Sequence, residues 1–373
     1  MWRATEPRVN DLSHMRTALA LARRGLGTVW PNPAVGCVLV KEGAVVGRGW
    51  TQPGGRPHGE TEALGRAGPR AEGATAFVSL EPCCHWGRTP PCAEALIAAG
   101  IARAVMPIED PDPRVAGRGI ARLRAAGIAV EIGLCAPEAA ELNAGFFSRI
   151  RLGRPMVTLK LATTLDGRIA GADGQSRWIT GTAARRRGHL LRATSDAVMV
   201  GSNTVLADDP DLTCRLSGLE DRSPIRVVVD GALRVPLTAR VVAGAARVPT
   251  WFLVREGIEE ARRSAFAERG VEIIEVPAGP GGRIDLARAL LALGHRGLTR
   301  LLVEGGGGLA AALFAADLVD RIAWFRAPMI LGDDGLAAVA ALGVSALATA
   351  PRFRRLSFEA VGEDVLETFG RAA

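Results

Sequence analysis

The sequence contains no tyrosine and only two lysines among its 46 basic side chains, so arginine carries nearly all of the positive charge. It also contains no run of eighteen apolar residues, which argues against a membrane-spanning helix. Residues Met1 to Pro7 include no apolar stretch of the kind that a signal peptide needs, so we expect a cytoplasmic protein. In that compartment the six cysteines are not expected to form a disulfide framework.

The formal net charge of +7 is spread evenly along the chain. Residues 1–150 contain 17 Lys and Arg against 14 Asp and Glu, and the remaining residues contain 29 against 25. No basic tail and no interleaving of aromatic with basic residues accompanies this excess, which argues against a nucleic-acid partner. The length of 373 residues predicts two or three domains, each with room for a full core.

Two series of alternating strands and helices meet near residue 150. In the first we expect a hairpin of 35–40 with 45–46, strands over 76–80, 103–107 and 128–132, and helices over 12–24, 58–67, 92–99 and 117–126. In the second we expect strands over 156–162, 197–201, 225–230, 250–254, 271–276, 300–304 and 319–325, and helices near 183–193, 258–268, 285–293 and 309–316. This alternation predicts an α/β protein with parallel strands and two layered domains, 1–150 and 151–373.

Three side chains that bind zinc occur near one carboxylate in the first series. His58 and Glu60 form an H-x-E pair at the start of a predicted helix, and Cys83 and Cys92 each follow a proline. One imidazole and two thiolates leave a fourth zinc position for water, and a carboxylate that is not a ligand can transfer protons. The order H-x-E then P-C is typical of zinc-dependent nucleobase deaminases. We therefore predict one zinc ion held by His58, Cys83 and Cys92, with Glu60 as the catalytic acid and base.

The spacing of the cysteines leaves one alternative ligand. Eight residues separate Cys83 from Cys92, whereas the general signature has two, so Cys84 competes with Cys83 for this role. In an extended backbone the Cys84 side chain points the opposite way, which favours Cys83. We expect the other three cysteines, which have apolar neighbours, to be small core residues: Cys37, Cys135 and Cys214.

The second series contains weaker signals. The glycine-rich segment 304–308 follows a predicted strand and precedes a predicted helix, where backbone amides can cradle a phosphate; a flexible turn is the alternative. We interpret 176–181 as a turn-rich segment with a buried tryptophan and 204–213 as a polar loop. Arg192 and Arg215 could clamp a substrate phosphate, with ordinary surface arginines as the alternative.

The run from Glu81 to Cys92, EPCCHWGRTPPC, resembles the long zinc loop of the bifunctional riboflavin-biosynthesis deaminase/reductase family. That family has the same interval between its ligand cysteines. Segments 31–36 and 110–119 resemble the family as well. The resemblance implies a cytidine-deaminase-like α/β/α layered first domain, in which Asn32 holds the substrate near the zinc.

The same resemblance implies that the loop 85–91 helps to close the deaminase pocket. Two positions in this half depart from the common pattern of the family. Gly59 stands where many members carry alanine, and Trp86 stands where many carry a second histidine.

The second series resembles the reductase half of this family, which has a dihydrofolate-reductase-like fold and uses NADPH. The resemblance places these residues at the cofactor: Ala162, Trp178, Thr204, Asp208, Gly306, Gly307, Gly308, Leu309, Ala310, Ala311 and Ala312. It places these residues at the substrate: Ser176, Arg192, Leu212, Arg215 and Glu304. Lys160 is the one lysine of this half and has no assigned role, and Gly231 stands where some members offer a serine hydroxyl to the cofactor. Arg255 is a candidate for contact with the 2′-phosphate.

The resemblance implies a bifunctional enzyme of riboflavin biosynthesis. The first domain would hydrolytically deaminate 2,5-diamino-6-(5-phosphoribosylamino)pyrimidin-4(3H)-one with zinc. The second would reduce the ribosyl group of 5-amino-6-(5-phosphoribosylamino)uracil to ribityl with NADPH. The expected partner is therefore a small pyrimidine ribose phosphate, with no nucleic acid and no membrane, and a homo-oligomer is left open.

Two other functions compete with this interpretation. A zinc-dependent deaminase of tRNA or another nucleic acid with an accessory binding domain would carry the same zinc motif, and the even charge distribution argues against it. A non-catalytic scaffold could keep the fold, and the intact set of His58, Glu60, Cys83 and Cys92 argues against that.

Overall fold

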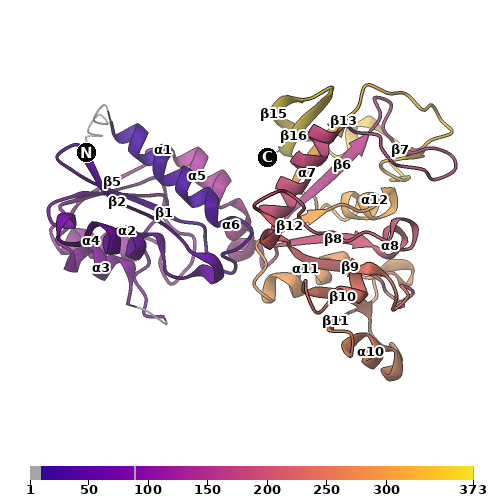
Figure 1. The fold of residues 1–373 in the computed structure, drawn as a ribbon, viewed down its shortest axis with the longest axis horizontal. Coiled ribbons are helices and arrows are strands. Elements are labelled where there is room, and N and C mark those ends of the chain that lie inside the picture. The colour runs from indigo at the N-terminus through magenta and orange to yellow at the C-terminus, as the bar shows by residue number, and fades with distance from the viewer. Residues whose placement is uncertain (1–9, 88–89, 373) are drawn as a thin grey trace. The chain divides into compact units, whose positions relative to one another are not determined.

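The computed structural model describes residues 10–87 and 90–372, and the chain separates into two units between Leu152 and Gly153 (Figure 1). Each unit has its own sheet and its own hydrophobic cores. In the described part of the chain, no helix is both long and apolar enough to cross a lipid bilayer.

The first unit is built on a five-stranded sheet with the order β2-β1-β3-β4-β5. Its strands are β1 (Gly36–Lys41), β2 (Ala44–Trp50), β3 (Thr75–Val78), β4 (Arg103–Met106) and β5 (Ala129–Ile132). β1 pairs antiparallel with both β2 and β3, whereas β3, β4 and β5 are parallel. The predicted hairpin is therefore confirmed, and the predicted parallel arrangement holds for the last three strands.

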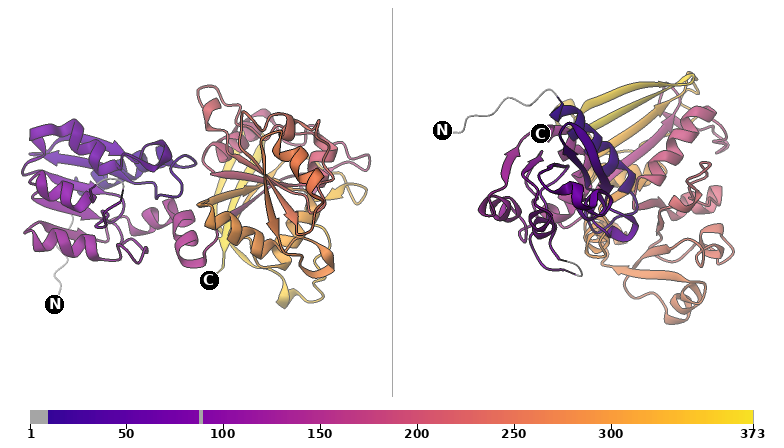
Figure 2. Two further views of the ribbon diagram at one scale, coloured as in Figure 1. Left: turned by 90° about the horizontal axis from the view of Figure 1, so that it is seen from below. Right: turned by 60° about the vertical axis from the view of Figure 1, so that its left-hand side comes forward.

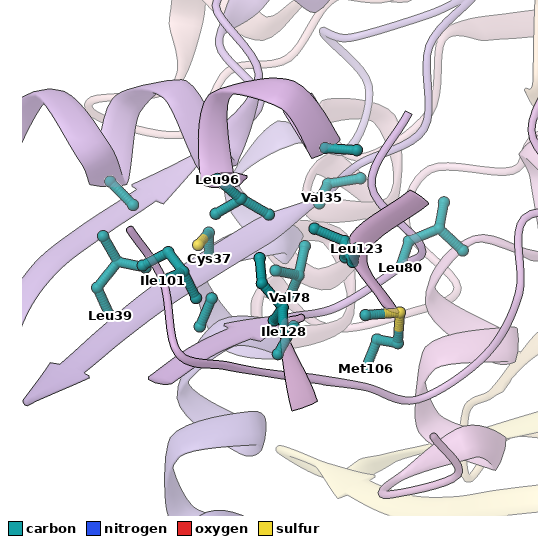
Figure 3. Close-up of a cluster of buried hydrophobic side chains, with 14 of the residues drawn as sticks. Val35, Cys37, Leu39, Val78, Leu80, Leu96, Ile101, Met106, Leu123 and Ile128 are labelled. Carbon is teal, nitrogen blue, oxygen red and sulfur yellow. The ribbon is translucent and has the colours of Figure 1, made fainter. Parts of the chain in front are cut away.

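Helices cover both faces of this sheet (Figure 1). They are α1 (Asp11–Ala22), α2 (Gly59–Ala67), α3 (Cys92–Ala98), α4 (Arg118–Ala125), α5 (Ala136–Leu142) and α6 (Ala144–Leu152), with short 3-10 turns η1 (Arg23–Gly25), η2 (Pro53–Gly55) and η3 (Gly68–Ala71). Side chains of β1 alternate between two cores, as strand geometry requires. Val38 packs with α1 and α5, whereas Cys37 and Leu39 pack with α2, α3 and α4. Figure 3 shows part of the second core, where Val78, Leu96 and their neighbours are buried together.

The second unit contains a nine-stranded sheet with the order β11-β10-β9-β8-β12-β6-β13-β16-β15. Figure 2 shows the ribbon from two further directions. Its strands are β6 (Met156–Thr163), β8 (Ala197–Gly201), β9 (Ile225–Val229), β10 (Thr250–Arg255), β11 (Val271–Val276), β12 (Arg300–Val303), β13 (Arg321–Arg326), β15 (Phe353–Val361) and β16 (Asp364–Arg371). The seven strands from β11 to β13 are parallel, and β16 and β15 add an antiparallel edge. A separate small sheet joins β7 (Arg168–Ala170) to β14 (Leu336–Ala337).

The helices of the second unit mostly connect successive parallel strands. They are α7 (Thr182–Ala193), α8 (Ser202–Asp208), α9 (Arg240–Ala243), α10 (Glu260–Ala267), α11 (Leu286–His295) and α12 (Gly307–Ala315), with 3-10 turns η4 (Glu220–Arg222), η5 (Pro280–Gly282) and η6 (Leu347–Thr349). The predicted α/β class is confirmed, and the predicted strands and helices of this unit lie within a few residues of the observed ones.

Four details differ from the sequence-based expectations. The expected loop 204–213 is wrong in its first half, because α8 extends to Asp208. The Trp178 side chain is not buried, since 64% of its surface is exposed. Cys135 is only partly buried, whereas Cys37 and Cys214 are buried as expected. Several further elements were not predicted, namely α5, α6, α9, the small strands β7 and β14, and the β15–β16 hairpin.

Candidate active sites

Three elements of the first unit bring the predicted zinc ligands together. His58 is the N-cap of α2, Cys83 follows β3, and Cys92 is the first residue of α3. Their ligand atoms all lie within 4.8 Å of one another. His58 Nδ1 lies 3.3 Å from Cys92 Sγ and 3.7 Å from Cys83 Sγ, so Nδ1 is the nitrogen that faces the thiols. One imidazole and two sulfurs in this arrangement fit a zinc ion with an open position.

The two sulfurs differ in their affinity for protons. A hydrogen bond from the Cys92 thiol, together with His58 and the Cys92 backbone N–H, lowers the pKa of Cys83 to about 4. The same hydrogen bond to Cys83, together with burial, raises the pKa of the Cys92 thiol. Cys83 is therefore the more acidic of the two thiols, and zinc binding requires that both sulfurs lose their protons.

Glu60 lies in the first turn of α2 and is only 3% exposed. Burial raises its pKa to about 6, so the carboxyl can both accept and release a proton near neutral pH. Its Oε2 is buried and has no hydrogen-bond partner among the described residues. A buried polar atom without a partner is costly, and a bound water or substrate would supply one.

Cys84 lies outside the cluster of ligand atoms. Its Sγ donates a weak hydrogen bond to the carbonyl of Arg114 at 3.5 Å. Cys83 and Cys84 thus face different neighbours, as the extended-backbone argument predicts.

Glu81 is a buried residue of this site that the sequence did not single out. Its carboxylate is 3% exposed and accepts hydrogen bonds from the backbone N–H groups of Asp110, Gly117 and Ile120 at 3.0, 2.9 and 3.1 Å. These contacts tie the segment just before Cys83 to the start of α4. The sequence indicates Glu81 only as an acidic residue directly before the P-C pair. Its hydrogen-bond partners are backbone N–H groups, which a side-chain motif does not identify.

Asn32 is tied to the segment that leads into His58. Its Nδ2 donates to the Gly55 carbonyl at 3.3 Å, within the turn η2. Gly55 has a φ of +82°, and a Cβ at this position would collide with the Asn32 amide, so only glycine fits. Trp86 is 76% exposed, and residues 88 and 89 of the predicted pocket-closing loop 85–91 lie outside the described residues.

In the second unit, Glu304 joins two cationic side chains at the end of β12. Arg192 from α7 donates to both of its carboxylate oxygens, at 2.6 and 3.0 Å, and Lys160 Nζ from β6 lies 3.7 Å away. Burial alone would raise the pKa of Glu304, but the charges of Arg192 and Lys160 lower it to about 2. Arg192 also donates a hydrogen bond to the Thr213 carbonyl, so its guanidinium is bound to other groups of the protein. The Arg215 side chain, in contrast, is exposed.

The glycine-rich segment lies beside α8. A Cβ at Gly307 would lie 2.6 Å from the Ala337 carbonyl oxygen, so this position requires glycine. A Cβ at Gly305 would lie 2.7 Å from Leu309 Cδ2, which is the end of a flexible side chain. A Cβ at Gly306 would lie 3.9 Å from Thr204 Oγ1. β8 and β12 are parallel neighbours, so α8 and α12 begin side by side at the same edge of the sheet. Their backbone N–H groups form a cradle that suits a phosphate.

The remaining predicted cofactor residues differ in how exposed they are and in their contacts. Ala162 is half-buried on β6, and Trp178 is exposed with the Arg185 guanidinium 4.5 Å from its ring centroid. Asp208 ends α8, and its carbonyl accepts a hydrogen bond from Arg177 at 3.2 Å. Within α12 the side chains of Ala310 and Ala311 are buried, whereas Gly308 at its beginning is exposed.

Of the predicted substrate residues, Leu212 and Ser176 lie outside the ion-pair cluster that Arg192 and Lys160 form with Glu304. Leu212 is 3% exposed and has a left-handed φ of +55°, next to the Thr213 carbonyl that binds Arg192. Ser176 is half-buried in the turn-rich segment before Trp178. The structure therefore brings Arg192, Glu304 and Lys160 into direct contact, and it places Leu212 beside them through the backbone.

Comparison with known proteins covers both units. The family model described as "RibD C-terminal domain" matches residues 155–366, more than half of the chain. The model described as "Cytidine and deoxycytidylate deaminase zinc-binding region" matches residues 8–108. Riboflavin biosynthesis protein RibD of Escherichia coli (strain K12) is 46% identical over 368 residues, which are 96% of this chain and 98% of that protein. The chain belongs to the RibD family.

Other RibD proteins are similar over nearly the whole length. The RibD protein of Aquifex aeolicus is 41% identical over 97% of this chain and 98% of its own. The solved structure of Acinetobacter baumannii RibD, form 1, aligns with a TM-score of 0.87 at 38% identity, covering 98% of this chain and 99% of that one. A Thermotoga maritima structure described as a diaminohydroxyphosphoribosylaminopyrimidine deaminase/5-amino-6-(5-phosphoribosylamino)uracil reductase aligns with a TM-score of 0.83 at 32% identity, covering 97% and 99%.

As a RibD protein, the chain is a bifunctional enzyme of riboflavin biosynthesis, a deaminase and a reductase. The prediction of the family and of both activities is confirmed by these similarities. The two-domain α/β class, with a cytidine-deaminase-like first domain and a RibD reductase domain after it, is confirmed as well.

Proposed function

We propose that the domain 1–150 deaminates 2,5-diamino-6-(5-phosphoribosylamino)pyrimidin-4(3H)-one and that the domain 151–373 reduces the ribosyl group of 5-amino-6-(5-phosphoribosylamino)uracil. The observation that carries the first assignment is the cluster of His58, Cys83 and Cys92, whose ligand atoms lie within 4.8 Å of one another. Glu60 is buried in the first turn of α2, two residues after His58, which supports an acid/base role beside the metal.

In the first domain His58, Cys83 and Cys92 hold the zinc ion. Zinc at such a site supplies Lewis-acid activation of water. Glu60 would take the two protons of the attacking water in turn through its unpartnered oxygen, and it would pass the first to the ring nitrogen and the second to the departing amine. A pKa of about 6 leaves this carboxyl mostly ionised at neutral pH and still able to carry a proton. Asn32 orients the pyrimidine.

In the second domain the substrate lies against Glu304, Arg192 and Lys160. NADPH supplies the reducing equivalents. The pKa of about 2 keeps Glu304 ionised, so its carboxylate accepts hydrogen bonds from sugar hydroxyls. Arg192 holds this carboxylate in place, and Arg215, Leu212 and Ser176 complete the substrate side.

The cofactor lies across the starts of α8 and α12. Thr204 and the glycines 306–308 receive its phosphates, and the open space beside Gly308 supports that placement. Ala162, Trp178 and Asp208 line the remainder. Leu309, Ala310, Ala311 and Ala312 act as the helix that supports the cradle rather than through their side chains, because Ala310 and Ala311 are buried.

The enzyme works in the cytoplasm on a small pyrimidine ribose phosphate and needs no nucleic acid. Salt dependence separates this proposal from deamination of RNA, because each phosphate neutralised in an RNA complex makes binding weaker at higher salt. We expect the zinc-loaded protein to deaminate the free diaminopyrimidine phosphate at a rate that changes little between 50 and 200 mM salt. Deamination of RNA, with no turnover of the free pyrimidine, would contradict the proposal.

A further inference from the structure

One edge of the second sheet carries an arginine that the proposed mechanism does not use. The parallel strands β10, β9, β8, β12 and β6 are neighbours in that order, so their carboxyl ends lie side by side. The proposed cofactor contacts are on β6 at Ala162, after β12 at the start of α12, and after β8 at the start of α8. The next strand outward, β9, ends at Val229 and leads into the loop that contains Arg234.

The order of these strand ends fixes the direction of a bound dinucleotide. The reacting end must reach the substrate residues, and Glu304 lies at the end of β12, next to β6. The pyrophosphate then lies at the starts of α12 and α8, and the adenosine half extends toward β9. Neighbouring strands are about 4.8 Å apart, so β9 lies roughly 10 Å from β12, which is on the scale of one nucleotide.

The Arg234 side chain is held at the start of α8 and remains accessible. Its Nη2 donates to Ser202 Oγ at 2.8 Å and to Asn203 Oδ1 at 2.8 Å. Its side chain is 55% exposed. Both hydrogen bonds use Nη2, which leaves Nη1 for a ligand, and a guanidinium fixed on one side is well suited to bind a phosphate on the other.

The carboxylate at the end of β9 faces the protein interior. In enzymes that bind NAD, an acidic residue at a comparable strand end hydrogen-bonds the ribose 2′-hydroxyl. Here the Asp230 side chain is 0% exposed, and its Oδ2 accepts the backbone N–H of Val235 at 2.8 Å. Its other oxygen lies 4.0 Å from Arg234 Nε. That oxygen is buried without a hydrogen-bond partner among the described residues, so Ser202 and Asn203 rather than Asp230 hold the arginine. The side chain presented to the ribose is therefore cationic.

Arg255 was the sequence-based candidate for the 2′-phosphate, and the structure gives it other partners. Its Nε donates to the Gly231 carbonyl at 3.1 Å, and its Nη1 donates to the Gly282 carbonyl at 3.1 Å. A Cβ at Gly231 would lie 3.2 Å from Arg255 Cγ, so the glycine makes room for this arrangement. Arg255 thus bridges two loops, one strand farther from the cradle than Arg234.

We propose that Arg234 recognises the 2′-phosphate of NADPH and sets the preference of this reductase for NADPH over NADH. This inference rests on the proposed NADPH-dependent reduction in the second domain. Hydrogen bonds to a charged group contribute enough that loss of this contact corresponds to about 10- to 100-fold in affinity.

The test measures dissociation constants by nucleotide fluorescence in the full-length protein and needs no turnover. We expect R234Q to weaken NADPH binding about 10- to 100-fold and to leave NADH binding unchanged. R234K should recover part of the affinity, because lysine keeps the charge without the guanidinium fork. R296Q, which removes a surface arginine paired with Glu272, is the control for net charge and should behave as wild type.

Two fragments give a second readout that is independent of the nicotinamide. Wild type should bind 2′,5′-ADP more tightly than 5′-ADP, and R234Q should bind them equally. If wild type prefers NADPH and R234Q keeps that preference, or if R255Q alone removes it, the inference is wrong and the proposed reductase function stands. If wild type binds neither nucleotide, the proposed function fails together with the inference.

Discussion

Two buried glutamates show how neighbouring groups set the chemistry of a carboxyl at the scale of single residues. Glu60 has its pKa raised to about 6 because burial disfavours its charge. Glu304 is also buried, but Arg192 and Lys160 lower its pKa to about 2. The first can exchange protons near neutral pH, whereas the second is a permanent anion, so the same residue type serves different purposes in the two units.

Glu304 should make the stability of the second unit depend on pH. Its pKa is about 2 in the folded protein, below the ordinary value of 4.5, so its contribution is full above about pH 5 and declines as the pH falls toward 2. This lowering of the Glu304 pKa corresponds to about 3 kcal/mol of folding free energy at neutral pH. We expect E304Q to unfold at a lower urea concentration than wild type at pH 7. The two urea midpoints should approach each other as the pH falls below 4.5. Equal midpoints of the two proteins at pH 7 would contradict this account.

The adjacent cysteines provide a matched pair of variants. C84S should bind one zinc per chain, because the Cys84 thiol lies outside the ligand cluster and donates to the Arg114 carbonyl. C83S should lose stoichiometric zinc, because it removes one of the three clustered ligand atoms. Metal analysis of the purified variants by mass spectrometry decides between them. Loss of zinc in C84S with retention in C83S would reverse the assignment.

At the scale of elements, hydrophobic periodicity predicted the regular helices and strands and missed the exposed or short ones. β15 was missed because nearly all of its residues are exposed, so no alternation marks it. α8 was missed because only Ser202 and Val205 in it are buried. The zinc ligands were predictable, since their identity and spacing are written in the sequence. The contacts of Glu81 and Arg234 were not, because they depend on how distant segments meet.

Glu81 connects two elements, and its removal should loosen both. E81Q replaces one acceptor oxygen with an NH2 group that faces backbone N–H donors at the start of α4. We expect it to lower the free energy of unfolding of the first unit by about 1–3 kcal/mol, measured by denaturant unfolding. E94Q is the control, because Glu94 pairs with Arg122 on the surface and should contribute less than about 1 kcal/mol. Equal effects of the two variants would show that Glu81 is not a clamp.

At the scale of the whole molecule, two units with separate cores carry two kinds of chemistry. In the proposed function, hydrolysis in the first unit depends on the cluster of His58, Cys83 and Cys92 with Glu60, and reduction in the second depends on the ion pairs of Glu304. Because the residues proposed for each site belong to a single unit, we expect a change in one site to leave the chemistry of the other intact.

The most direct test supplies each substrate in turn to full-length E60Q and follows NADPH oxidation together with zinc content. We expect E60Q to keep its zinc, because Glu60 is outside the ligand cluster, and we expect oxidation from the diaminopyrimidine substrate to fall by about 100-fold or more. With 5-amino-6-(5-phosphoribosylamino)uracil supplied instead, E60Q should oxidise NADPH at the wild-type rate. Wild-type oxidation from the diaminopyrimidine substrate, or loss of oxidation with both substrates while zinc is retained, would contradict the account.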